Sequence, residues 1–154
     1  TSKENFLKTL HISAYSLTEM TRLLSPKMNN GSSIMALTYY GSTRYMQSYN
    51  VMGVAKAALE TSIRYLAVDM GDRGIRVNAI SAGPMRTLAG AVINKSRQIY
   101  NYTINNSPIK KPLSQDDIGK SSVYLVSNLS NGVTGEILYV DNGYNNVGMS
   151  IQDL

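Results

Sequence analysis

Tyr49 and Lys56 are the side chains whose chemical types and spacing most directly suggest a reactive pair. They stand seven residues apart, which on an α-helix places them on the same side, about 20° out of register. A phenol has a pKa of about 10, and a nearby ammonium and the positive end of a helix both lower it. We therefore expect Lys56 to lower the pKa of Tyr49, and the pair to stabilise a substrate oxyanion and hold a cofactor ribose. The spacing alone also allows an alternative, in which Tyr49 caps a helix surface and Lys56 is a solvated charge.

A second candidate site is the segment Ala-Gly-Pro-Met-Arg-Thr at residues 82–87, which follows a predicted strand. Gly83 permits a close approach of the backbone, and Pro84 fixes the direction of the chain. Thr87 precedes a predicted helix, whose first N–H groups attract anions. The segment suits contact with a phosphate group, although as bare sequence it also suits an ordinary turn.

Helical segments alternate with short apolar runs along the chain, and these elements must position both candidate sites. Helical spacing of apolar residues or a helix-capping signal marks residues 5–28, 51–70, 88–106 and 114–127. Apolar runs typical of covered strands occupy residues 32–40, 74–80 and 136–140. This order predicts an α/β fold with a doubly wound, Rossmann-like parallel sheet. Ligands bind such sheets beyond the carboxyl ends of the strands, where both candidate sites fall.

The composition of the 154 residues excludes several classes of protein. With 43% hydrophobic and 16% charged residues, the chain has the material for a buried core, so it is not disordered as a whole. It contains no cysteine, which excludes disulfides and thiolate chemistry and favours a reducing, cytoplasmic location. No apolar run reaches the roughly 18 residues that a membrane helix needs, so we expect no membrane association.

The charged residues point to an acidic partner and to no metal. The net charge is +5, which favours an acidic ligand or protein. The Lys and Arg residues are dispersed and form no recognition motif, which argues against nucleic acid. The one histidine, His11, has no carboxylates at metal-ligand spacing, and we expect no metal site.

Three stretches of the sequence together resemble a known enzyme family. They are LTYYGSTRYMQSYNVMGVAKAALE at residues 37–60, VNAISAGPMRTLAG at 77–90 and GEILYVDNGY at 135–144. In this set Tyr39 is followed by Tyr49, and six residues separate Tyr49 from Lys56. The arrangement is similar to that of the enoyl-acyl-carrier-protein reductase branch of the short-chain dehydrogenase/reductase superfamily. Ordinary members of the superfamily place Tyr and Lys four residues apart, an offset that this chain lacks.

The resemblance implies the reduction of a trans-2-enoyl thioester on acyl carrier protein, in fatty acid elongation, with hydride from NADH; NADPH remains open. Tyr49 would donate a hydrogen bond to the thioester carbonyl, Lys56 would bind the nicotinamide ribose, and Tyr39 would line the acyl site and assist. Other residues implied to contact the cofactor are Leu37, Thr38, Ala82, Gly83, Pro84, Met85, Thr87, Leu88 and Ala89. Residues implied to meet the substrate or the carrier are Tyr39, Tyr49, Met52, Lys95 and Arg97. The resemblance also implies a homotetramer.

The family's glycine-rich phosphate turn has no counterpart before residue 31. We therefore expect further sequence upstream of Thr1, and residues 1–154 to be the C-terminal part of a single Rossmann-like reductase domain. Two alternatives stay open. One is a short-chain dehydrogenase/reductase that acts on ketones or alcohols, and the other is a noncatalytic module that binds an acidic ligand.

Overall fold

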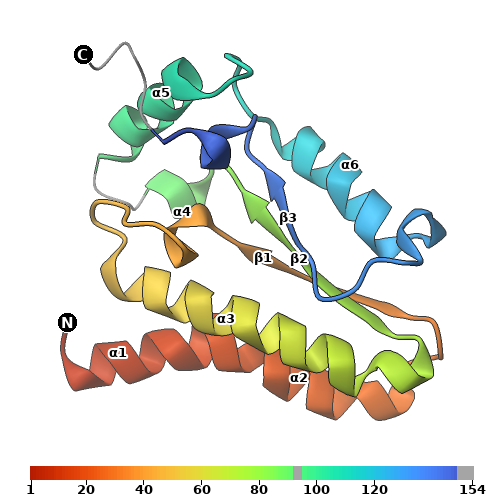
Figure 1. Ribbon diagram of the computed structural model, residues 1–154. Helices are drawn as coiled ribbons and strands as arrows, with labels where there is room; N and C mark the ends of the chain where they lie inside the picture. Colours follow the sequence, from red (N-terminus) through yellow and green to blue (C-terminus); the bar gives the residue numbers. More distant parts are fainter. Residues whose placement is uncertain (92–94, 149–154) are drawn as a thin grey trace.

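Three parallel strands form the centre of the protein in a computed structural model that describes residues 1–91 and 95–148 (Figure 1). The strands are β1 (Ser33–Thr38), β2 (Arg76–Ala82) and β3 (Ile137–Val140). They lie side by side in chain order, and both pairings are parallel. Because parallel strands end at the same edge, the residues that follow β1 and β2 are brought together there. The predicted α/β fold with a parallel sheet is confirmed.

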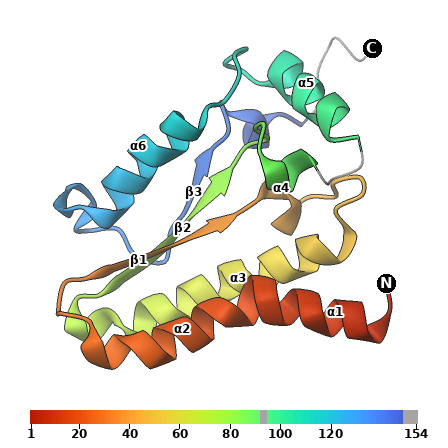
Figure 2. The same ribbon diagram turned by 180° about the vertical axis from the view of Figure 1, so that it is seen from behind.

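Helices cover both faces of the sheet (Figures 1 and 2). The long helix α3 (Asn50–Asp69) packs against β1 and β2 on one face, and α6 (Gln115–Val126) packs against the other. The N-terminal helical segment lies on the outer side of α3, so that α3 is sandwiched between it and the sheet. The first half of α3 is therefore held rigidly at the edge where β1 ends.

The N-terminal segment is less regular than its periodicity predicts. The helix expected over residues 5–28 is divided into α1 (Lys3–Leu10), a π-helical turn (His11–Tyr15) and α2 (Ser16–Leu24). A 3₁₀ turn (Ser25–Lys27) follows. A single π turn does not end the helix, and the apolar residues keep spacings of three and four across it, so the sequence does not reveal it.

The segment expected to form one helix over residues 88–106 forms two. They are α4 (Leu88–Ala91) and α5 (Ser96–Asn106), and Lys95 in front of α5 has a left-handed backbone with a φ of 60°. The predicted capping box of α6 is confirmed. The Ser114 N–H donates to Asp117 Oδ2 at 3.0 Å, and the Asp117 N–H donates to Ser114 Oγ at 3.1 Å.

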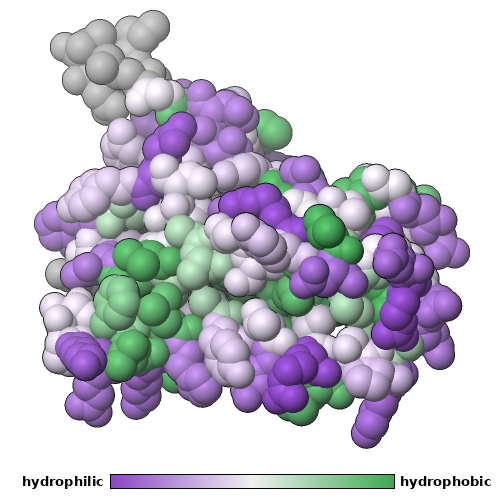
Figure 3. Space-filling model, turned by 60° about the horizontal axis from the view of Figure 1, so that its bottom comes forward, coloured by the Kyte–Doolittle hydropathy of each residue, from purple (hydrophilic) through white to green (hydrophobic). Residues whose placement is uncertain are grey.

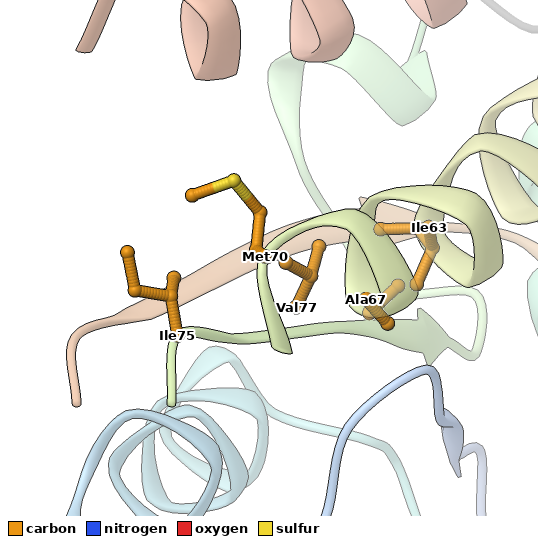
Figure 4. Packing of buried hydrophobic residues seen from close by; sticks show 6 residues of the cluster. Ile63, Ala67, Met70, Ile75 and Val77 are labelled. Atoms are coloured by element: carbon orange, nitrogen blue, oxygen red, sulfur yellow. The ribbon is translucent and has the colours of Figure 1, made fainter. Parts of the chain in front are cut away.

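The main core lies between α3 and β2. Figure 4 shows Ile63 and Ala67 of α3, and Met70 directly after it, close to Ile75 and Val77, all of them buried. Residues 76–81 of β2 are all buried, which explains why this strand shows no alternation of polar and apolar residues. A second cluster joins Ile80 to Ile118 and Leu125 of α6. The central strand is thus fixed from both faces, and the loop that follows it starts from a rigid point.

The outer surface of the N-terminal helices and α3 carries exposed apolar side chains. Figure 3 views the molecule from this side and shows hydrophobic residues among hydrophilic ones. The large exposed residues are Phe6, Leu7, Ile12, Tyr15, Met20, Leu23, Leu24, Val54, Tyr65 and Val68. None of the helices within the described ranges is long and apolar enough to cross a bilayer.

Candidate active site

A cavity of about 500 Å³ opens at the carboxyl edge of the sheet, where β1 and β2 end. Its walls come from the end of β1, the start of α3, the loop after β2, and the helices α5 and α6. A volume of this size suits part of a nucleotide cofactor or a small substrate. The sequence-predicted residues that line it are Leu37, Thr38, Tyr39, Tyr49, Lys56, Ala82, Gly83, Pro84, Met85 and Thr87.

Tyr49 is the residue immediately before α3, and its ring packs against that of Tyr39. Two glycines make room for this arrangement. A Cβ atom on Gly41 would lie 2.5 Å from Cδ1 of Tyr49, and one on Gly53 would lie 2.7 Å from the Gly41 carbonyl oxygen. Both distances are far below ordinary contact, so the position of the Tyr49 ring depends on two residues without side chains.

Lys56 lies in the second turn of α3 and is half-buried. Its Nζ donates a hydrogen bond of 2.8 Å to the backbone oxygen of Leu37, at the end of β1. Lys56 and Tyr49 line the same cavity, as their helical spacing predicts. The ammonium is thereby anchored on the strand, with its charge at the cavity wall.

The expectation that Tyr49 has a lowered pKa is wrong. Burial and, to a smaller extent, the nearby Glu60 carboxylate raise the pKa of Tyr49 to about 12. Burial also raises the pKa of Tyr39 above its ordinary value, with smaller contributions from Tyr49 and two other tyrosines. Loss of water around a phenol disfavours the phenolate. Tyr49 is therefore a neutral hydrogen-bond donor at physiological pH.

Glu60 is a component of the site that the sequence analysis missed. It is 5% exposed, and its Oε1 accepts a hydrogen bond of 2.6 Å from the Thr38 hydroxyl, itself buried. Its carboxylate opposes the lowering of the Lys56 pKa that burial causes. Its position four residues after Lys56, one turn along the same helix face, is the signal that could have found it.

The loop after β2 closes the cavity on the side opposite α3. A Cβ on Gly83 would lie 2.9 Å from Cα of Asp141, so its missing side chain admits the neighbouring chain after β3. The close backbone contact that Gly83 allows is therefore made within the protein, and not with a ligand as expected from the sequence. Pro84, Met85 and Thr87 line the cavity, and α4 begins directly after Thr87, as predicted.

Five of the residues implied by the resemblance are not among those that line the cavity. Met52 is half-buried in α3, Leu88 is 93% exposed, and the side chain of Ala89 is outside the described part of the structure. Lys95 and Arg97 are exposed at the start of α5. Arg97 lines an adjacent hollow together with Arg86, whose guanidinium lies 5.1 Å from the centre of the Tyr100 ring.

The remaining walls are residues whose types and spacing carry no chemical signal. They are Met46, Gln47, Ser96, Ile99, Tyr100, Gln115 and Ile118. Met46 and Gln47 belong to the loop before α3, and the others reach the cavity from α5 and the start of α6. The surface of the cavity is largely apolar, and Met46, Ile99 and Ile118 contribute to it.

A parallel sheet covered on both faces, with a cavity at the strand ends, defines the open α/β proteins that bind ligands at this edge. The model of the enoyl-(acyl carrier protein) reductase family matches residues 1–145, and the chain belongs to this family. Enoyl-[acyl-carrier-protein] reductase [NADH] 1 of Rhizobium meliloti is 54% identical over 153 residues, which are 99% of this chain and 56% of that relative.

Solved structures show the same likeness. The crystal structure of FabI from Candidatus Liberibacter asiaticus is 53% identical, with a TM-score of 0.93, over 97% of this chain and 58% of that one. The reductase of Anaplasma phagocytophilum, solved in complex with NAD, is 48% identical with a TM-score of 0.92 over 98% and 56% of the two chains. The chain thus spans little more than half the length of these relatives.

Proposed function

We propose that the protein reduces the trans-2-enoyl thioester of enoyl-acyl carrier protein with hydride from NADH, in fatty acid elongation. The observation that carries this proposal is the cavity at the strand ends, which brings Tyr39, Tyr49 and Lys56 together. Membership of the reductase family supports it, and so do the names of relatives, which specify NADH.

The cavity fits the nicotinamide end of such a cofactor. Its volume of about 500 Å³ leaves room for a ring and a sugar beside a substrate group, and Lys56 offers ammonium N–H groups at the wall. Lys56 would hold the ribose hydroxyls, with Leu37 and Thr38 beside it. The loop residues Ala82 to Met85 would border the nicotinamide, and Thr87 would meet the phosphates.

When bound, the cofactor supplies the hydride, and the protein supplies geometry and charge stabilisation. Addition of hydride to the β-carbon places negative charge on the thioester oxygen as an enolate. The neutral Tyr49 hydroxyl donates a hydrogen bond to that oxygen, and the bond becomes stronger as the charge develops. The apolar walls strengthen this interaction by excluding water. Tyr39 fixes the Tyr49 ring and lines the acyl site.

The substrate test compares crotonyl thioester with acetoacetyl thioester, using the protein produced from its complete reading frame. We expect oxidation of NADH with the crotonyl compound and little with the acetoacetyl compound. The reverse preference would make the protein a ketone reductase. Failure to bind either nicotinamide cofactor in a titration would indicate a noncatalytic module.

We also propose that the protein works in the cytoplasm, receives acyl carrier protein at Lys95 and Arg97, and associates as a homotetramer. The net charge of +5 supports an acidic partner. The apolar residues exposed on the N-terminal helices and α3 support self-association, since surfaces of this kind are commonly buried between subunits. Sedimentation equilibrium measures the assembly directly, and a monomer at micromolar concentration would contradict it.

A further inference from the structure

The buried Glu60 carboxylate has no role in the reaction as derived above. It is 5% exposed, in the middle of α3, and Thr38, which hydrogen-bonds to it, is 4% exposed. Burial of a carboxylate is unfavourable unless hydrogen bonds and an opposite charge compensate for it. The 2.6 Å distance between the Thr38 hydroxyl and Oε1 is in the range of a hydroxyl that donates to a charged carboxylate.

The opposite charge is one helical turn away. Lys56 precedes Glu60 by four residues on α3, so both side chains leave the same face of the helix. That face is turned to the end of β1, where Leu37 and Thr38 are consecutive residues. Lys56 donates to the Leu37 oxygen, and Thr38 donates to Glu60. Two hydrogen bonds thus join one turn of α3 to two adjacent residues of the strand.

This arrangement constrains the ammonium in two ways. The Leu37 carbonyl fixes where Nζ lies, and the Glu60 carboxylate, four residues further along α3, supplies a negative charge nearby. Thr38 in turn fixes the carboxylate. The same negative charge favours the protonated form of Lys56 and of Tyr49, because it raises the pKa of both.

We infer that Thr38 and Glu60 are a positioning pair, which holds the Lys56 ammonium charged and at the cavity wall for the ribose hydroxyls of the cofactor. The inference rests on the proposed function, in which Lys56 binds the nicotinamide ribose. Neither residue of the pair needs to touch the substrate. Glu60 is not among the residues that line the cavity, so its effect passes through Lys56 and should appear in cofactor affinity more than in turnover.

Three variants separate the charge from the hydrogen bond. Glu60→Gln keeps an oxygen that accepts from Thr38 but removes the charge. Thr38→Val removes the hydroxyl with little change of shape, and Thr38→Ser restores it. Each is made in the protein produced from its complete reading frame. The dissociation constant of NADH is measured by fluorescence titration, together with KM for NADH and kcat with crotonyl thioester.

We expect Glu60→Gln and Thr38→Val to raise the dissociation constant and KM for NADH about tenfold, because an ammonium that is no longer held at the cavity wall loses a charge-assisted hydrogen bond to the ribose. We expect kcat at saturating NADH to fall much less. Thr38→Ser should restore the affinity of the unchanged protein. Rescue by a hydroxyl of different shape would not follow from packing alone.

Ser130→Ala provides the matched control. Ser130 is buried in the 3₁₀ turn Asn128–Ser130 that follows α6, donates to the Leu125 oxygen at 3.0 Å and accepts from Arg76 at 2.7 Å. Its loss removes buried hydrogen bonds away from the cavity, and we expect a lower melting temperature with unchanged NADH affinity. The inference is overturned if Glu60→Gln and Thr38→Val behave in the same way as this control.

Failure of the inference and failure of the proposed function give different results. A protein that reduces crotonyl thioester, with unchanged NADH affinity in all variants of the pair, retains the function and loses the inference. A protein that does not reduce the thioester loses the proposed function. If Glu60→Gln does not fold, the comparison of Thr38→Val with Thr38→Ser decides alone, since equal NADH affinities in these two would overturn the inference.

Discussion

The rings of Tyr39 and Tyr49 meet edge to face, with their centres 4.9 Å apart and their planes at 70°. This contact joins the loop after β1 to the start of α3, and it orients the hydroxyl that is proposed to face the substrate. Around this contact, the backbone at Gly41 and Gly53 lies so close to neighbouring atoms that neither position has room for a Cβ atom. The geometry of the proposed donor therefore depends on residues that have no chemistry of their own.

Gly53→Ala tests this dependence. The new Cβ would lie 2.7 Å from the Gly41 oxygen, so the loop and the Tyr49 ring must shift. We expect kcat to fall, by up to about 10²-fold if the ring moves by about 1 Å, and stability to fall by about 1–3 kcal/mol. Gly119→Ala in α6 is the control, because its Cβ would meet nothing within 4 Å. We expect Gly119→Ala to increase the free energy of unfolding by about 0.5–1 kcal/mol and to leave kcat unchanged. Full activity in Gly53→Ala would show that the ring position is not critical.

Tyr49→Phe and Lys56→Ala should affect different steps. Removal of a donor to a developing oxyanion typically costs about 10²–10³-fold in kcat, so we expect a loss of this size in Tyr49→Phe with nearly unchanged NADH binding. Lys56→Ala should weaken NADH binding, which is measured by titration. Unchanged turnover in Tyr49→Phe would remove this phenol from the mechanism.

NADH affinity should decrease at alkaline pH because of Lys56. Burial lowers the pKa of Lys56 below its usual 10.5, against an opposing effect of Glu60, whereas the pKa of Tyr49 is raised to about 12. Below its pKa the lysine is charged and binds the ribose, and above it the neutral amine binds less well. We expect the midpoint of this decrease in NADH affinity to lie below pH 10.5. The Tyr49→Phe variant should show the same pH dependence.

Lys56→Arg is the informative variant for this pH dependence, because a guanidinium stays charged throughout the range. The NADH affinity of Lys56→Arg should not change over the alkaline pH range in which Lys56 loses its proton. A decrease that persists in Lys56→Arg would assign the titration to another group.

Sequence alone predicted the elements that have a strong period or a local signal. The spacing along α3 placed Tyr49 and Lys56 beside one cavity, and Ser114 with Asp117 located the start of α6. It did not reveal the π turn at residues 11–15, because that turn leaves the apolar stripe intact. The left-handed backbone of Lys95 was missed because a left-handed lysine has no distinctive sequence signal.

The walls and the electrostatics of the site were less predictable, because both depend on packing between distant segments. Ile99 and Ile118 approach the cavity only once α5 and α6 are in place. The direction of the Tyr49 pKa was wrong for the same reason. The positive charges of Lys56 and of the helix end can be placed near Tyr49 from the sequence. Burial and the Glu60 carboxylate, which determine the direction of the pKa shift, cannot.

The proposed docking of the acidic carrier protein at the start of α5 should depend on salt. Lys95 and Arg97 are exposed beside the cavity, where they can attract an acidic surface without touching the reacting atoms. An increase in ionic strength from about 0.1 M to about 1 M shortens the Debye length from about 10 Å to about 3 Å. We expect KM for carrier-bound substrate to rise severalfold, and KM for a small thioester to change less.

Arg97→Gln should reproduce the effect of salt at low ionic strength, and Lys8→Gln should not. Lys8 is an exposed cation in the last turn of α1, so it controls for the change in net charge. The electrostatic contribution of Arg97 is screened at about 1 M salt, so the KM values of the variant and the unchanged protein should converge there. Equal sensitivity of the two substrates to salt, or equal effects of the two variants, would place carrier docking elsewhere on the protein.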